Sequence, residues 1–389
     1  MRVAGFDLAY CSNIHPGESW DQISTALSGA MPRVRELLGV TGPMGIGLRL
    51  SAAAATTLES PARLAAFRAF LSAGDYYVFT INGFPYGAFH GERVKENVYL
   101  PDWRDPLRVE YSNRLARLSL EFSDESEFSI STVPGAFREV SQSPQDAEAI
   151  AAGYLRHAAA LRQLRQHTGR TIVLAIEPEP AYFIETVDEA VTFFCTQLFR
   201  LDAVGRVARE TGVTLTVEDV RRHIGVCLDT CHMAVEFEDP AAAFDRLSRA
   251  GIRVGKVQIT SALRSTSRPG RAVLARFAND TYLHQVVKRG AGGLVRYTDL
   301  PDALQSTDGE DEEWRVHFHV PIFVQSVGEL ETTQPYVAEV LSLLKQNRAC
   351  RHLEVETYTW DVLPPEYRTD DACSAIAREL EWVRRQLNA

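Results

Sequence analysis

Eight short apolar runs, rich in β-branched residues, alternate with helical stretches along the whole chain. They span residues 2–10, 45–52, 76–83, 127–133, 171–179, 223–230, 252–260 and 352–360. Strands that alternate with helices build a parallel sheet, which is either a closed (β/α)8 barrel or an open doubly wound sheet. A ninth run, residues 314–323, lies in the long interval before the last one.

The motif after the first strand helps to separate these two architectures. No G-x-G-x-x-G follows residues 2–10, and the chain contains no P-loop. Both absences weaken the case for a nucleotide-binding doubly wound sheet. We therefore predict an α/β fold, a (β/α)8 TIM barrel that residues 1–389 form as a single domain. Ser60, Ser143 and Asp239 each precede a proline, a pattern typical of helix N-termini.

Two long segments interrupt the regular alternation. Residues 84–105 follow the third predicted strand and residues 264–312 follow the seventh. Both leave the C-terminal face of a barrel, where active sites are built. Because residues 84–105 combine glycines with aromatic residues, we predict that they cover part of a pocket. Lys95 in this segment and Arg49 are candidates to meet a phosphate or a carboxylate.

The composition limits the classes of function. Lys and Arg number 41 against 51 Asp and Glu, a formal charge of -10, which makes nucleic acid a poor candidate partner. The six cysteines form no C-x-x-C pair, which favours reduced thiols in a reducing compartment. With no signal-peptide pattern and no apolar run of membrane-spanning length, we expect a cytoplasmic protein without a membrane span. A homo-oligomer is compatible with the sequence.

Polar side chains end several of the predicted strands. They are Glu177, Asp229, Gln258, the pair His317 and His319, and Glu356. Strand ends meet over the barrel mouth, and carboxylates gathered there repel one another unless a cation lies between them. Carboxylate, amide and imidazole ligands suit Mn²⁺, Mg²⁺ or Zn²⁺, so we predict a divalent metal. Alternatively, Asp229 caps the next turn and His232 lies on a surface helix.

Four of these segments, IEPEP, LDTCH, HFHVP and VETYTW, resemble the xylose-isomerase-like TIM-barrel superfamily. That superfamily includes sugar isomerases, ketose 3-epimerases and apurinic endonucleases of the endonuclease IV type. The resemblance implies the metal ligands Glu177, Asp229, Gln258 and Glu356. Glutamine stands at Gln258 where the pattern has histidine, and its weaker carbonyl ligand favours Mn²⁺ or Mg²⁺ over Zn²⁺. If Gln258 is too weak, we expect a nearby histidine to replace it: His232, His317 or His319.

The longer motifs YCSNIHPGESW, TINGFPYGAFHGERVKENVYLPDW, LDTCH and VETYTW resemble the EboE family of "metabolite traffic" proteins, often labelled sugar phosphate isomerase/epimerase. The resemblance covers nearly the whole chain. It implies a small polyol, sugar or sugar phosphate as the ligand. The candidate substrate-binding residues are Asn13, His15, Asn82, His232, His317 and His319.

Three functions from different classes remain. In an isomerase or epimerase, Glu177 and Glu356 would bind the metal and also exchange protons with carbon through an enediolate. In a carrier, the same barrel would bind a metabolite without turnover. A phosphodiesterase of the endonuclease IV type would need more histidine ligands and a basic groove, and both Gln258 and the net charge disfavour it. The presence of both glutamates favours an enzyme.

Overall fold

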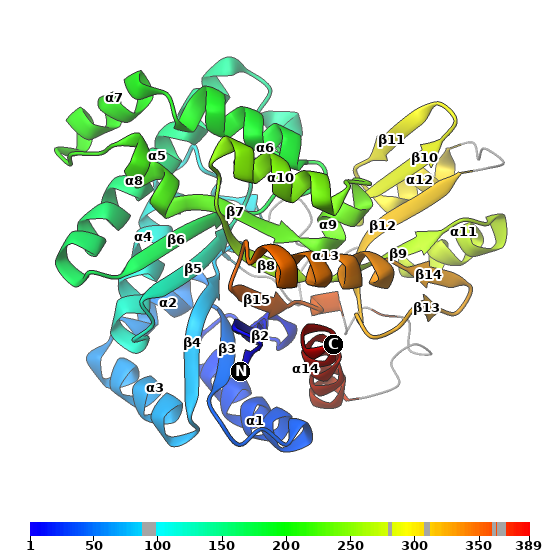
Figure 1. The fold of residues 1–389 in the computed structure, drawn as a ribbon, viewed down its shortest axis with the longest axis horizontal. Helices are drawn as coiled ribbons and strands as arrows, with labels where there is room; N and C mark the ends of the chain where they lie inside the picture. Colours follow the sequence, from blue (N-terminus) through cyan, green and yellow to red (C-terminus); the bar gives the residue numbers. More distant parts are fainter. Residues whose placement is uncertain (88–98, 279–281, 307–311, 360–362, 364–370) are drawn as a thin grey trace.

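The computed structural model describes residues 1–87, 99–278, 282–306, 312–359, 363 and 371–389. Within these residues, eight parallel strands form a barrel, and the prediction of a (β/α)8 TIM barrel is confirmed (Figure 1). The barrel strands are β2 (Phe6–Tyr10), β3 (Met44–Arg49), β4 (Tyr76–Asn82), β5 (Glu127–Thr132), β6 (Thr171–Ile176), β7 (Ile224–Asp229), β8 (Val254–Ile259) and β15 (His352–Val355). The short strand β1 (Arg2–Val3) pairs antiparallel with β2.

The barrel closes between its first two strands. The strands are hydrogen-bonded in the order β2-β15-β8-β7-β6-β5-β4-β3, and a parallel bridge from Cys11 to Gly47 joins the ends. A Cβ atom at Gly47 would collide with the carboxylate of Glu354 and with the carbonyl of Tyr10. A glycine at this point therefore lets the backbone approach a charged group in the barrel interior.

Helices surround the barrel. They are α1 (Trp20–Leu38), α2 (Ala52–Leu58), α3 (Pro61–Ala73), α4 (Pro106–Phe122), α5 (Pro144–Thr168), α6 (Val187–Phe193), α7 (Leu201–Thr211), α8 (Val217–His223), α9 (Thr230–Val235), α10 (Pro240–Ala250), α13 (Gln334–Asn347) and α14 (Ala372–Asn388). Ser143 and Asp239 cap α5 and α10 through their side chains, as their positions predict, whereas the side chain of Ser60 makes no capping bond.

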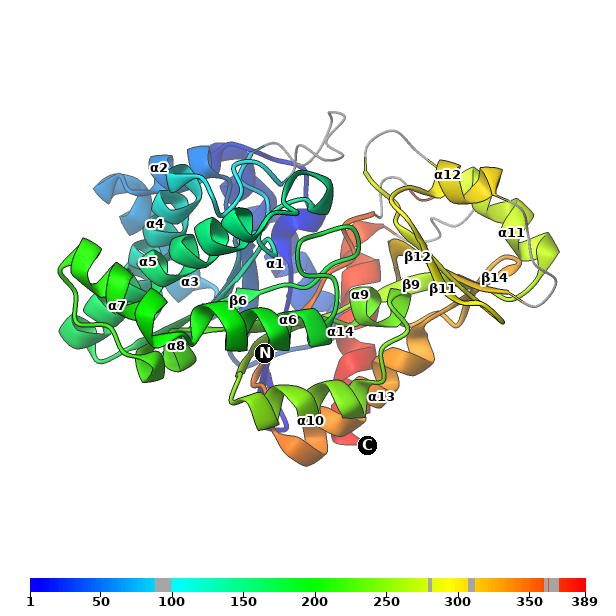
Figure 2. The same cartoon turned by 90° about the horizontal axis from the view of Figure 1, so that it is seen from above.

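A second sheet stands beside the barrel (Figure 2). Its six strands are antiparallel and run in the order β11-β10-β12-β9-β14-β13. Their bounds are β9 (Ser261–Ser265), β10 (Val286–Gly290), β11 (Gly293–Tyr297), β12 (Glu313–Val320), β13 (Ser326–Val327) and β14 (Leu330–Thr332), and α11 (Arg268–Leu274) and α12 (Leu300–Gln305) accompany them. The segment after the seventh barrel strand was expected as a long loop, and its strands were not predicted.

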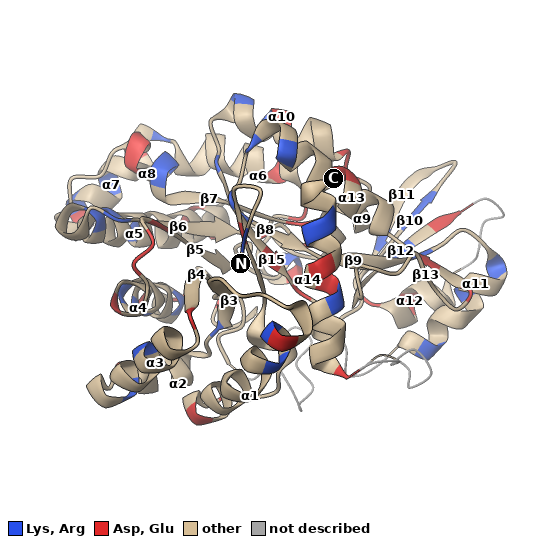
Figure 3. Cartoon of the chain, turned by 60° about the horizontal axis from the view of Figure 1, so that its bottom comes forward, with Lys and Arg blue, Asp and Glu red and all other residues tan. Residues whose placement is uncertain are grey.

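The charged residues are distributed over the outer helices. Helices α8 and α14 each carry both acidic and basic positions (Figure 3). Across the part of the chain that the structure describes, no helix has both the length and the apolar character needed to cross a membrane.

Candidate functional site

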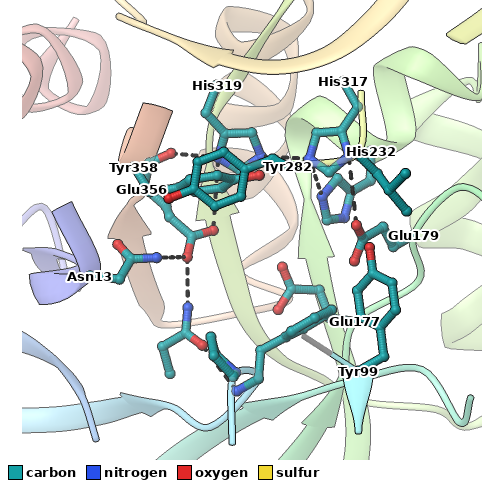
Figure 4. A pocket seen from close by; sticks show the side chains of 14 residues that line it. Asn13, Tyr99, Glu177, Glu179, His232, Tyr282, His317, His319, Glu356 and Tyr358 are labelled. Atoms are coloured by element: carbon teal, nitrogen blue, oxygen red, sulfur yellow. Dashed lines mark hydrogen bonds and ion pairs between the residues drawn. The ribbon is translucent and has the colours of Figure 1, made fainter. Parts of the chain in front are cut away.

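A pocket of about 540 Å³ lies over the C-terminal ends of the barrel strands (Figure 4). Its polar lining consists of Asn13, Asn82, Glu177, Glu179, His232, His317, His319 and Glu356. Its apolar and aromatic lining consists of Phe84, Pro85, Tyr99, Tyr282, Leu283 and Tyr358. The lining comes from barrel strands, from β12 of the second sheet, and from the segments that follow them.

Three buried carboxylates converge beside this pocket. Glu177 follows β6, Asp229 ends β7 and Glu356 follows β15, and each offers an oxygen within 4.8 Å of the other two. Burial, then the charges of Glu356 and Asp229, raises the pKa of Glu177. Burial and the charge of Asp229 also raise the pKa of Glu356, to about 8. Ionising all three carboxylates together is therefore unfavourable in free energy unless a cation offsets their repulsion.

Asp229 caps helix α9 with one carboxylate oxygen, and its other oxygen takes no part in the cap. Its Oδ1 accepts the backbone N–H groups of Cys231 at 2.7 Å and His232 at 3.1 Å, at the start of α9, and the hydroxyl of Thr260. Its Oδ2 is buried and has no hydrogen-bond partner among the described residues. The capping role and the metal-ligand role, which were alternatives in the sequence, are therefore compatible.

Two asparagines orient Glu356. The side-chain amides of Asn13 and Asn82 donate to its Oε1 at 2.7 and 2.6 Å. Asn13 follows β2 and Asn82 ends β4, so residues more than 270 positions away in sequence hold this carboxylate. Hydrogen bonds to a charged acceptor favour its ionised form and oppose the effect of burial.

Gln258 lies in β8 and pairs in register with Asp229 on one side and Glu354 on the other. Its amide oxygen and nitrogen are buried, and both are without hydrogen-bond partners in the described part of the chain. Two residues earlier, Lys256 forms a 2.5 Å ion pair with Glu354, and both side chains are 0% exposed. The charge of Lys256 opposes the rise in the pKa of Glu177 and Glu356, whereas the charge of Glu354 adds to the rise at Glu356.

Three histidines form the other polar part of the pocket. His232 lies in α9, while His317 and His319 share one face of β12. The Nε2 atom of His317 lies 3.2 Å from Nε2 of His232 and 3.1 Å from Nε2 of His319. Burial lowers the pKa of all three, to about 3 for His232 and about 4 for His319. The three imidazoles are therefore neutral near pH 7.

The structure brings together most of the residues singled out in the sequence. His15 differs, because it bonds to the Tyr10 hydroxyl at 3.0 Å and lines a separate small cavity with Arg49. Arg49 itself bonds to Glu18 and to the carbonyl of Gly87, both at 2.7 Å. Lys95 lies outside the described residues.

Both described ends of segment 84–105 reach the pocket, through Phe84 and Pro85 at one end and Tyr99 at the other. Residues 88–98 lie outside the described residues. Sequence reasoning missed Tyr99, Tyr282 and Tyr358 as pocket residues. Two of them carried a signal: Tyr99 lies in segment 84–105, which was predicted to cover a pocket, and Tyr358 lies two residues after Glu356.

No protein family model matches this chain, and no curated protein sequence matches it. Several solved structures are similar to this chain in fold. A xylose isomerase-like TIM barrel protein from Mycobacterium smegmatis, in complex with magnesium, aligns over 100% of this chain and 98% of its own with a TM-score of 0.51 and 12% identity. A xylose isomerase domain protein from Planctomyces limnophilus aligns over 100% and 99% with a TM-score of 0.50 and 14% identity.

The fold is that of a xylose-isomerase-like TIM barrel. Identities this low establish the fold and leave the activity to be argued from the site. The narrower resemblance to the EboE family stays a prediction.

Proposed function

We propose that the protein is a metal-dependent isomerase or epimerase of a small sugar or related polyol. The observation that carries this proposal is the group of three buried carboxylates, Glu177, Asp229 and Glu356, which come from three strands and adjoin a pocket. Clustered buried acids cost free energy, and such groups are typical of sites that bind a cation or move a proton.

The residues present fit a divalent cation. Glu177 Oε2, Asp229 Oδ2 and both amide atoms of Gln258 are buried without hydrogen-bond partners in the described residues. Together with Glu356, the carboxylates of Glu177 and Asp229 and the amide oxygen of Gln258 would supply oxygen ligands. Such ligands suit Mg²⁺ and Mn²⁺ better than Zn²⁺. The similar Mycobacterium smegmatis protein was solved with magnesium. When bound, the cation would polarise neighbouring carbonyl and hydroxyl oxygens.

The two glutamates would exchange protons with carbon. Glu177 follows β6 and Glu356 follows β15, and both line the pocket. With Oε2 of Glu177 bound to the cation, the other oxygen of the same carboxylate would accept a proton. Asn13 and Asn82 hold Oε1 of Glu356, which leaves Oε2 to carry a proton. A pKa near 8 for Glu356 suits a group that must both release and receive a proton near neutral pH.

The described part of the pocket lining is aromatic and acidic. Among the described residues of the pocket there is no lysine and no arginine. Arg49 was one of two candidates to bind a phosphate. Its guanidinium donates hydrogen bonds to the carboxylate of Glu18 and to the carbonyl of Gly87. A lining that combines aromatic side chains with acids suits a polyol with an apolar face. We therefore keep both a sugar and a sugar phosphate as candidate substrates, and the test includes ketoses and ketose phosphates.

The test combines metal analysis with solvent deuterium uptake into a set of ketoses and ketose phosphates. Wild-type protein should contain a divalent metal and exchange deuterium into at least one ketose. Glu177→Gln should lose both, whereas the control Glu339→Gln, at an exposed position of α13, should keep both. Equal metal content in wild type and Glu177→Gln would refute the ligand assignment.

The same experiment distinguishes the carrier hypothesis. If wild type binds metal in a Glu177-dependent manner but exchanges deuterium into no sugar, the isomerase proposal is refuted and a binding role is favoured.

A further inference from the structure

Gln285 joins the second sheet to the barrel at the candidate site. It lies directly before β10 and is 1% exposed. Tyr282 and Leu283, just before it in the chain, line the pocket, as does His317 of β12. The side-chain amide of Gln285 contacts His317 on one side and the segment that follows β6 on the other. A residue outside the barrel strands therefore touches two parts of the pocket wall.

The neighbours of this amide fix its orientation. Its nitrogen, Nε2, donates to the carbonyl of Pro180 at 3.1 Å and lies 3.5 Å from Oε1 of Glu179. Its oxygen, Oε1, lies 2.6 Å from Nδ1 of His317. Reversing the amide would place its oxygen against two other oxygens, so Gln285 donates to Pro180 and accepts from His317.

The backbone also holds Gln285 beside His317. The N–H of His317 donates to the carbonyl of Gln285 at 2.8 Å, and the carbonyl of His317 accepts from Nδ1 of His284 at 2.9 Å. The adjacent residues Val286 and Val316 form a register pair of β10 and β12. The second sheet therefore sets the positions of both the amide and the imidazole.

The contact decides which nitrogen of His317 carries a hydrogen. A neutral imidazole has one N–H, and Gln285 keeps it on Nδ1, which leaves a lone pair on Nε2. Nε2 of His317 lies 3.2 Å from Nε2 of His232 and 3.1 Å from Nε2 of His319. Both neighbours bond through Nδ1 to a backbone carbonyl, so their Nε2 atoms also carry lone pairs. Without an acceptor at Nδ1, the hydrogen of His317 would be more stable on Nε2, where a neighbouring ring can accept it.

The same amide helps to hold the loop after β6. Glu179 lies at the start of this loop, which closes through a hydrogen bond from the N–H of Glu179 to the carbonyl of Ile184 at 3.1 Å. Ala181 in the loop has a φ of 73°, in the left-handed region that residues other than glycine rarely adopt. Such a conformation persists where surrounding contacts hold it, and the bond from Gln285 to Pro180 is one of those contacts.

We propose that Gln285 is a positioning residue of the candidate site, which fixes the hydrogen of His317 on Nδ1 and holds the loop after β6 against the second sheet. His317 then presents its Nε2 lone pair to the pocket, where it can accept a hydrogen bond from a substrate hydroxyl. The effect of Gln285 on turnover rests on the proposed function, whereas its effect on the tautomer of His317 does not.

The tautomer can be measured by ¹⁵N NMR of histidine-labelled protein, treated with a chelator and held near pH 7. The protonated and the unprotonated nitrogens of a neutral imidazole resonate far apart, and the signals of His317 are those missing from His317→Gln. Wild type should carry the hydrogen of His317 on Nδ1. Gln285→Met, a side chain of similar length that lacks the amide, should move it to Nε2 in a large share of molecules. Gln285→Glu keeps an acceptor and should keep the hydrogen on Nδ1.

A hydrogen on Nε2 of His317 in wild type would overturn the proposal. So would an unchanged tautomer in Gln285→Met, because Glu179, whose Oε1 lies 3.6 Å from the same Nδ1, would then serve equally well as the acceptor. If Gln285→Met does not fold, Gln285→Glu decides, and a hydrogen on Nε2 alone in that variant overturns the proposal. The control Gln334→Met, at a buried glutamine that begins α13, should leave the tautomer unchanged.

Deuterium uptake supplies the second readout. Gln285→Met should retain the divalent metal, because the four proposed ligands are unchanged, and should exchange deuterium about tenfold or more slowly than wild type at saturating ketose. Gln334→Met should match wild type. Equal rates in Gln285→Met and wild type would overturn the effect on turnover. If wild type exchanges with no ketose, the proposed function fails and the tautomer of His317 alone decides this proposal.

Discussion

Replacing Lys256 by methionine should destabilise the protein strongly, because it would leave Glu354 as a buried unpaired acid. Lys256 and Glu354 form a 2.5 Å ion pair in which both side chains are 0% exposed. The lysine also donates to the hydroxyl of Ser131 at 3.2 Å. Breaking a buried ion pair by removing one partner costs about 3–5 kcal/mol. We expect a loss of that size in the free energy of unfolding of Lys256→Met.

The assay is thermal and urea-induced unfolding, followed by circular dichroism. For 389 residues, an unfolding entropy of about 2 cal/mol/K per residue gives roughly 0.8 kcal/mol/K, so the expected loss lowers Tm by about 4–6 °C. The double variant Lys256→Met/Glu354→Gln removes both charges and should recover part of that loss. Lys345→Met, at a half-buried lysine whose hydrogen bond among the described residues goes to the carbonyl of Gln386, should cost about 1 kcal/mol or less.

Two results would refute this reasoning. One is a loss in Lys256→Met no larger than in Lys345→Met, which would mean that the buried charge is solvated or protonated at little cost. The other is a double variant less stable than Lys256→Met, which would mean that packing around Lys256, rather than charge pairing with Glu354, accounts for the loss.

Three further predictions concern other described residues. Burial raises the pKa of Glu379 to about 7, so the folded state holds a proton that the unfolded state releases above pH 4.5. The free energy of unfolding of wild type therefore falls as pH rises through this window. In urea unfolding, Glu379→Gln should gain stability relative to wild type by about 1.4 kcal/mol per pH unit between pH 5 and 7. Asp229→Asn should lose metal in elemental analysis but keep the cap of α9, whereas Asp229→Ala should also lose about 0.5–2 kcal/mol of stability. Asn82→Ala withdraws a donor from Glu356 and should raise its pKa, so the basic limb of the pH–rate profile should move upward by about 1–2 pH units, and an unmoved limb would contradict the proton-transfer role.

The barrel could be predicted because its strands follow a simple rule. Strands buried on both faces form continuous apolar runs, and each of the eight runs in the sequence became a barrel strand. The acids at their ends were conspicuous for the same reason, since Glu177 and Asp229 each interrupt an apolar run where it reaches the barrel mouth. Lys256 was overlooked because it lies within a strand, two residues before Gln258, where its partner Glu354 is distant in sequence.

The second sheet was not predicted, for a different reason. Its strands β13 and β14 have two and three residues, and β11 is largely exposed, so neither apolar runs nor regular spacing mark them. Its pairings are antiparallel and do not follow chain order, because β12 pairs with β10 and β9, which both precede it, while the later strand β14 also pairs with β9. Only the run at residues 314–323 was visible. The sheet matters for the site because β12 carries His317 and His319 to the pocket.

The buried acids at the barrel mouth relate the proposed cation to the proposed proton transfer. Glu177, Glu179, Asp229, Glu354 and Glu356 are all buried at one end of the barrel, and Lys256 pairs with Glu354. If ionised, the four remaining acids would carry four negative charges at short range, at a cost that hydrogen bonds from Asn13, Asn82 and Gln285 offset only in part. One divalent cation bound by the carboxylate oxygens would balance two of those charges. A single cation would leave two charges for protons to neutralise, and a protonated acid is what an isomerase needs to return a proton to carbon. The number of bound metal ions therefore bears on the mechanism as directly as the identity of the substrate does.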